Sequence, residues 1–137
     1  MVTAKFKYLL VCETAQLLPD NKGGDAVMIL QPIMKKIVPF VPTQLTFSVA
    51  GGIIDLEQNS KHMVKITMTD PNGVEKEVAT APIEVGVHKR KDAMGMGQIG
   101  FEFRNFEIYH EGLYIVKAYL DNVFNMEYSF EVLVRED

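Results

Sequence analysis

The sequence contains a single cysteine, Cys12, and no tryptophan. One thiol excludes an intrachain disulfide framework and a zinc site built from several cysteines. Basic residues are also in short supply, because 14 Lys and Arg stand against 18 Asp and Glu and leave a net charge of −4. This balance argues against general binding to nucleic acid or to an acidic membrane surface.

Long hydrophobic runs are absent as well. No segment approaches the roughly 20 apolar residues that a membrane-spanning helix needs. The apolar run from Tyr8 to Cys12 ends at Glu13, which makes it shorter than the apolar stretch of a secretory signal, about 7–15 residues long. We therefore interpret this run as a first β-strand and expect a cytoplasmic protein with no membrane contact.

The remaining composition is that of an ordinary globular protein. The chain has 137 residues, of which 47% are hydrophobic and 23% charged. A chain of this length can bury an adequate core without disulfide or metal cross-links. No repeat, linker or low-complexity tract divides it, so we expect one domain over residues 1–137.

Alternation of apolar and polar residues with a period of two dominates the chain, and helical spacing is scarce. Shorter alternating rows lie at 6–10, 45–49, 64–68, 83–87 and 99–103. The longest row lies near the C-terminus and consists of Phe124, Met126, Tyr128, Phe130, Val132 and Val134. Such rows predict β-strands that bury one face and expose the other.

The stretch Leu113–Leu120 differs because both of its rows are largely apolar. This pattern predicts a central strand covered on both faces, or a strand with one face in a protein interface. The candidate interface row consists of Leu113, Ile115 and Tyr119.

Turn residues separate these rows. Asp70-Pro71-Asn72-Gly73 has the residues of a type I turn, and Asp121-Asn122 suits a two-residue hairpin loop. Gly-rich breaks are expected at 20–24 and 50–52, and the prolines within 27–42 predict an irregular or edge strand over 27–41. Together these signals predict an all-β fold, an antiparallel β-sandwich of about seven to nine strands.

The run His110-Glu111-Gly112-Leu113-Tyr114-Ile115-Val116 resembles the Asp-x-Gly-x-Tyr-x-Cys corner of immunoglobulin-like domains. The resemblance implies that Tyr114, next to Gly112, bonds back to the backbone across the corner. Val116 stands where those domains have a disulfide cysteine, and no tryptophan is available for the core. Antibody-type domains are therefore excluded, and a disulfide-free immunoglobulin-like sandwich is expected.

A longer stretch is similar to an uncharacterised family of bacteria and phages. The similarity rests on a short first strand, a Gly-Gly turn, a Pro39-x-x-Pro42 exit followed by Gln44-Leu45-Thr46, the 70–73 turn and the 111–114 corner. Members of that family look like small stand-alone β-sandwiches of unassigned function. The resemblance supports the fold and implies no chemistry.

The segment 88–100 joins a basic cluster to a Gly/Met-rich stretch. Gly95–Gly100 matches the letters of the dinucleotide fingerprint, but a polar run precedes it and a strand pattern follows it, so we reject that interpretation. A solvated loop is the favoured interpretation, and a loop that binds an anion or an acidic partner is the alternative. The candidate residues are His88, Lys89, Arg90, Lys91, Gly95 and Gly97.

Catalytic and metal-binding patterns are not apparent. His62, His88 and His110 do not stand two or four residues apart, so no preformed metal site and no cofactor are predicted. Cys12 has no neighbouring base and is expected to be a buried, inert thiol. No serine stands beside a recognisable base, so we expect no enzymatic activity.

These observations favour a non-catalytic β-sandwich that works through protein contacts, as an accessory subunit or a homo-oligomer. A small-ligand or anion-binding protein that uses the 88–100 loop is one alternative. A structural component of a phage particle or of a secretion assembly is another.

Overall fold

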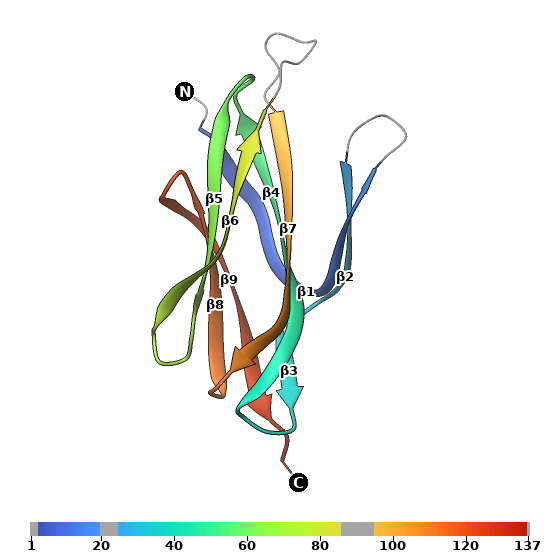
Figure 1. Ribbon diagram of the computed structural model, residues 1–137, viewed down its shortest axis with the longest axis vertical. Coiled ribbons are helices and arrows are strands. Elements are labelled where there is room, and N and C mark those ends of the chain that lie inside the picture. The colour runs from blue at the N-terminus through green and yellow to red at the C-terminus, as the bar shows by residue number, and fades with distance from the viewer. Residues whose placement is uncertain (1–2, 20–24, 86–94, 137) are drawn as a thin grey trace.

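The computed structural model describes residues 3–19, 25–85 and 95–136, and the strands within these ranges form two packed sheets (Figure 1). The strands are β1 (Lys5–Pro19), β2 (Asp25–Pro32), β3 (Lys35–Val38), β4 (Thr43–Leu56), β5 (Lys61–Thr69), β6 (Glu75–Glu84), β7 (Gly95–Ile108), β8 (Gly112–Leu120) and β9 (Val123–Val134). One sheet has the order β2-β1-β4-β7 and the other β3-β9-β8-β5-β6. The predicted all-β sandwich of seven to nine strands is confirmed. No helix that could cross a membrane occurs in the described ranges.

The core lies between the two sheets, where their inward-facing apolar rows meet. Phe47 of β4 is among its largest fully buried side chains. The Phe47 ring centroid lies 5.3 Å from that of Phe103, 5.6 Å from that of Phe106 and 6.0 Å from that of Phe130. Both sheets thus contribute to one aromatic cluster. β8 lies between β5 and β9, so its predicted central position in a sheet is confirmed. Only one of its two apolar rows is buried, so coverage on both faces is not observed.

Two predicted hairpins are confirmed, and local bonds explain both. In the β5–β6 turn the Gly73 amide donates to the Asp70 carbonyl at 2.9 Å. The Asp70 carboxylate also accepts from the amides of Asn72 and Val74, each at 2.9 Å. In the β8–β9 turn Asp121 and Asn122 have φ of 52° and 66°, the left-handed conformation that asparagine and aspartate tolerate best after glycine.

The predicted break at 50–52 is wrong, because β4 runs through it without interruption. Gly51 and Gly52 are needed there for space rather than for a turn. A Cβ atom on Gly52 would lie 2.3 Å from Tyr8 Cε1, and one on Gly51 would lie 3.0 Å from Phe6 Cε2. Aromatic rings of β1 cross the β4 backbone at these two positions, which leaves no room for a side chain.

The proline-containing segment 27–41 forms β2 and β3, the last strands of their respective sheets. The chain crosses from one sheet to the other at Ile33 and Met34. There the Ile33 amide donates to the Val11 carbonyl at 2.7 Å, and the Glu131 amide donates to the Met34 carbonyl at 3.0 Å. Because the chain crosses instead of turning back in a hairpin, β3 pairs parallel to β9, a departure from the antiparallel pattern expected.

β1 is longer than its contact with the sandwich. Its first half, Lys5–Cys12, pairs with β4, whereas from Thr14 onward β1 pairs with β2 alone among the described strands. Figure 1 shows this two-stranded arm, residues 13–19 and 25–31, projecting away from the two sheets. The sequence did not predict the arm, because alternation marks strands without showing where one strand leaves its sheet.

Candidate functional site

The predicted corner is a structural element at the start of β8. The Tyr114 hydroxyl donates to the His110 carbonyl at 2.8 Å, and its ring stacks on Phe130 with centroids 5.7 Å apart. Burial raises the pKa of the Tyr114 phenol, so the hydroxyl keeps the proton that it donates. Gly112 has a φ of +130°. Both residues hold the backbone of the corner in place, and the hydroxyl is already engaged.

The candidate interface row on β8 lies on the outer face of the five-stranded sheet. Leu113 is half exposed, whereas Ile115 and Tyr119 are partly covered. The Tyr119 ring packs edge-on against Phe124 at 5.9 Å, and the Lys65 ammonium lies 4.5 Å from the ring centroid. Polar neighbours therefore occupy one end of this row.

Glu75 is the centre of that polar group. Its Oε2 atom accepts a hydrogen bond from the Tyr119 hydroxyl at 2.5 Å and one from the Thr67 hydroxyl at 2.7 Å. These two bonds, that from Tyr119 first, hold the pKa of the Glu75 carboxyl below its ordinary value, with help from Lys117 and Lys65. The cluster fixes the orientation of Tyr119.

We expect that in Glu75→Gln the free energy of unfolding falls less steeply with decreasing pH than in the wild type. The lowered folded-state pKa means that the Glu75 carboxylate stabilises the fold above the unfolded-state pKa, about 4.3. That contribution is lost as the pH falls through the folded-state pKa. Urea unfolding between about pH 5 and pH 3 measures the slope, with Glu77→Gln as the matched control. Equal slopes in the wild type and in Glu75→Gln would contradict this.

The candidate loop 88–100 is only partly within the described residues. His88, Lys89, Arg90 and Lys91 lie outside them, so the anion-binding hypothesis stays a prediction. Gly95 and Gly97 belong to strand β7, and their placement in a loop is wrong. A Cβ atom on Gly95 would lie 2.9 Å from Val85 Cγ1. The glycine thus lets β7 pass close to the end of β6.

A contact that sequence reasoning missed joins Ser60, His62 and Asp121. His62 Nδ1 lies 2.6 Å from Asp121 Oδ2, and His62 Nε2 lies 3.2 Å from Ser60 Oγ. A hydroxyl, an imidazole and a carboxylate in contact resemble the nucleophile, base and acid of a catalytic triad. The Ser60 hydroxyl, however, donates its proton to the Glu57 carbonyl at 2.5 Å. We interpret the group as a link between the β4–β5 and β8–β9 turns. Within the described ranges no three potential metal ligands converge.

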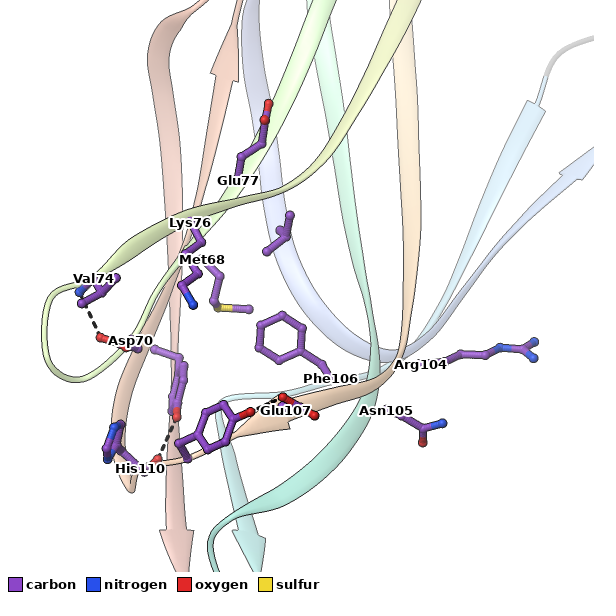
Figure 2. Close-up of a pocket in the computed structure, with 13 residues that line it drawn as sticks. Met68, Asp70, Val74, Lys76, Glu77, Arg104, Asn105, Phe106, Glu107 and His110 are labelled. Carbon is purple, nitrogen blue, oxygen red and sulfur yellow. Dashed lines mark hydrogen bonds between the residues drawn. The ribbon is translucent and has the colours of Figure 1, made fainter.

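A cavity of about 450 Å³ lies between the edge strands β6 and β7. We call it the inter-sheet groove. Its floor is apolar and consists of Met68, Val78, Phe106 and Tyr114. Its rim is polar and includes Lys76, Glu77, Glu107, Tyr109 and His110. Figure 2 shows Phe106 and Lys76 extending from opposite sides into this space, while Arg104 points away from it. The volume is within the range of ligand sites, about 300–1,000 Å³.

A second surface lies on the opposite edge of the sandwich. The segment 28–40, which we call the apolar edge, contains β3 and most of β2, and it carries exposed large apolar side chains. Met34 is 76% exposed, Ile37 62% and Phe40 55%. Met28 and Leu30 of β2 are also exposed. Scattered exposed apolar residues are ordinary, whereas here they recur along one stretch of the chain.

Comparison with solved structures supports the sandwich fold. The chain superposes on part of the Pseudomonas fluorescens alkylpurine DNA glycosylase AlkC, in a complex with DNA that contains an abasic site analog, with a TM-score of 0.57 and 10% identity. The match covers 94% of this chain and 30% of that one. A β-glucosidase from Listeria innocua in complex with glucose gives 0.56 and 12%, over 95% of this chain and 16% of that one. At these identities the likeness concerns the fold alone.

The chain spans less than a third of either of these enzymes. No protein of curated function matches it. A model of a family of unknown function, DUF6941, matches residues 7–133. This match begins within β1 and ends within β9, so it covers nearly the whole sandwich. The chain therefore belongs to DUF6941.

Proposed function

We propose that this protein is a non-catalytic interaction module, and that the apolar edge is the surface through which it binds a protein partner. The observation that carries the proposal is the run of exposed apolar side chains at Met34, Ile37 and Phe40 on a sheet edge. An edge strand also offers unpaired backbone N–H and C=O groups to a partner. Apolar contact and backbone pairing are therefore available at the same place.

Both lysines of the apolar edge have acidic neighbours. Lys36 of β3 forms an ion pair with Glu13 of β1 at 2.9 Å, and Lys35 lies 3.8 Å from Glu131 of β9. Lysines on edge strands ordinarily oppose strand addition. Because both lysines have acidic partners within the molecule, covering them with an apolar surface leaves less unpaired charge without water.

The module fits an accessory subunit or a homo-oligomer of a bacterial or phage system, in the cytoplasm or as part of a phage or secretion assembly. All of these share one requirement, a protein seated on the apolar edge. A test must therefore detect that contact and report the mass of whatever makes it.

A photo-reactive benzoylphenylalanine in place of Phe40 should form a covalent adduct in cells that produce the full chain. The side chain at this position is exposed, so the replacement leaves the core intact. The adduct is read by gel shift, and its mass distinguishes a second copy of this chain from another protein. Adding Ile37→Lys should abolish the adduct, because it places an unpaired charge in the apolar contact.

The matched control is the same photo-reactive residue at Val123, which is 64% exposed at the start of β9. No adduct is expected from this position. Equal adducts from both positions, or none from Phe40, would count against the apolar edge as the contact surface.

A further inference from the structure

The inter-sheet groove lies on the edge of the sandwich opposite the apolar edge. β2 and β3 begin the two sheet orders, and β7 and β6 end them. Among the described strands β7 pairs with β4 alone and β6 with β5 alone. Each therefore turns backbone N–H and C=O groups outward along the groove, and another extended chain is the partner that satisfies a row of such groups.

β6 and β7 converge at one end and diverge at the other. At the convergent end a Cβ atom on Gly97 would lie 3.5 Å from Ile83 Cγ2, ordinary contact across the two edges. At the divergent end lies the 450 Å³ cavity, bounded by Lys76 on β6 and Glu107 on β7. The sandwich is thus closed at one end of this side and open at the other.

The inward-facing side chains along this open side are incompletely covered. Those of β6 and β7 that pack on the core but remain partly exposed are Val78, Ala79, Ile83, Phe101, Phe103 and Phe106. The corresponding side chains deeper in the sheets, such as Phe47 and Val116, are fully buried. The apolar surface on this side continues past the last strand of each sheet, as it would if one more strand were to cover it.

The floor of the groove is rigid. Phe106 packs edge-on against Phe47 at 5.6 Å and against Phe103 at 6.3 Å, and the Tyr114 hydroxyl is held by the His110 carbonyl. Met68 is a flexible side chain beside them. A preformed apolar floor with one adaptable member loses little conformational entropy when it is covered.

The rim carries one cation without an acidic partner. Within the described ranges Lys76 forms no ion pair, whereas Glu107 accepts a hydrogen bond from the Tyr109 hydroxyl and Asp70 caps its own turn. Figure 2 shows the Lys76 side chain directed into the space beside Met68. A ligand that fills the groove gains binding free energy from a carboxylate placed beside the Lys76 ammonium.

We propose that the inter-sheet groove binds an extended peptide of another protein, which pairs with β7, places alternate apolar side chains on Phe106 and Met68, and brings a carboxylate to Lys76. The chemistry is that of strand addition, in which main-chain bonds supply affinity and pockets for alternate side chains supply specificity. This site is separate from the apolar edge, so the two proposals are tested by independent experiments.

The test uses a fluorescein-labelled peptide of about eight residues, the length of a strand opposite 101–108. Val and Leu alternate with Thr, and one Glu is placed to reach Lys76. Fluorescence anisotropy should show saturable binding. An isomer of the same composition with its apolar residues contiguous should bind about tenfold more weakly or worse, because it cannot place alternate side chains on the floor.

N-methylated peptides separate strand pairing from simple apolar contact, and a charge variant of the protein tests the contribution of Lys76. Methylation of every second peptide nitrogen removes the backbone donors on one edge of the peptide. When the methylated nitrogens are those that face β7, binding should weaken by about tenfold. Lys76→Glu should weaken binding of the Glu-containing peptide to a similar extent, about tenfold. Lys7→Glu, the same charge change at an exposed position of β1, is the matched control and should leave binding unchanged.

Amide chemical shifts locate the bound peptide. Changes at β6, β7, the β5–β6 turn and the floor residues Met68 and Tyr114 would support the proposal. Absence of binding, equal binding of the contiguous isomer, indifference to N-methylation in both registers, or shift changes confined to 28–40 would each overturn it.

Discussion

Phe47→Ala should lower the free energy of unfolding by about 3–5 kcal/mol. The Phe47 ring is 1% exposed and contacts Phe103 and Phe106 of β7 and Phe130 of β9. Its removal costs the transfer free energy of the ring and leaves a cavity between the two sheets, because the surrounding aromatic rings are held by other contacts. A domain of this size is stable by about 5–15 kcal/mol, so the loss is a large part of the total.

Phe40→Ala is the matched control, because it removes the same ring from an exposed position of the apolar edge. Its effect should stay within about 0.5 kcal/mol. Urea unfolding followed by circular dichroism measures both variants. Similar losses for the two would show that the aromatic cluster is not the centre of the core.

Gly112→Ala should destabilise the protein by about 2–5 kcal/mol. Two separate causes act at this position. The φ of +130° is a backbone conformation that L-residues rarely adopt, and a Cβ atom would lie 2.9 Å from Pro71 Cβ and 3.1 Å from Pro71 Cγ. The proline ring is rigid and cannot turn aside, so the corner or the β5–β6 turn must shift.

Gly73→Ala separates the two causes. Gly73 also has a positive φ, +85°, but a Cβ atom there would have no neighbour within 4 Å. Its replacement should cost about 1 kcal/mol, the strain of the left-handed conformation alone. Thermal and urea unfolding of both variants measure the difference. If Gly112→Ala were no worse than Gly73→Ala, the contact with Pro71 would contribute nothing to the corner.

Local patterns predicted the strands and the hairpins well. The alternating row at 124–134 is β9, and the turn residues Asp70–Gly73 and Asp121-Asn122 lie in tight turns. These features depend on neighbours close in sequence, so the residues that cause them are visible together. The same reasoning failed at Gly51-Gly52, where the rings of Phe6 and Tyr8 from another strand leave no space for a side chain.

The candidate sites were much less accessible to sequence reasoning. His62 meets Asp121 across 59 residues of sequence, and no motif spacing connects the two. The inter-sheet groove depends on which strands end each sheet, and strand order is not encoded in the alternation of any one strand. Phe106 and Lys76 each looked like an ordinary strand residue until β7 and β6 were found on the same edge.

The arm formed by 13–19 and 25–31 gives β1 two different stabilities along its length. Up to Cys12 the strand is bonded within the four-stranded sheet, and its buried residues unfold only with the whole domain. Beyond Thr14 it depends on a two-stranded ribbon, which is marginally stable by itself. We therefore expect hydrogen exchange to be faster in the arm than in the sandwich, with the change falling near the Ile33–Val11 bond.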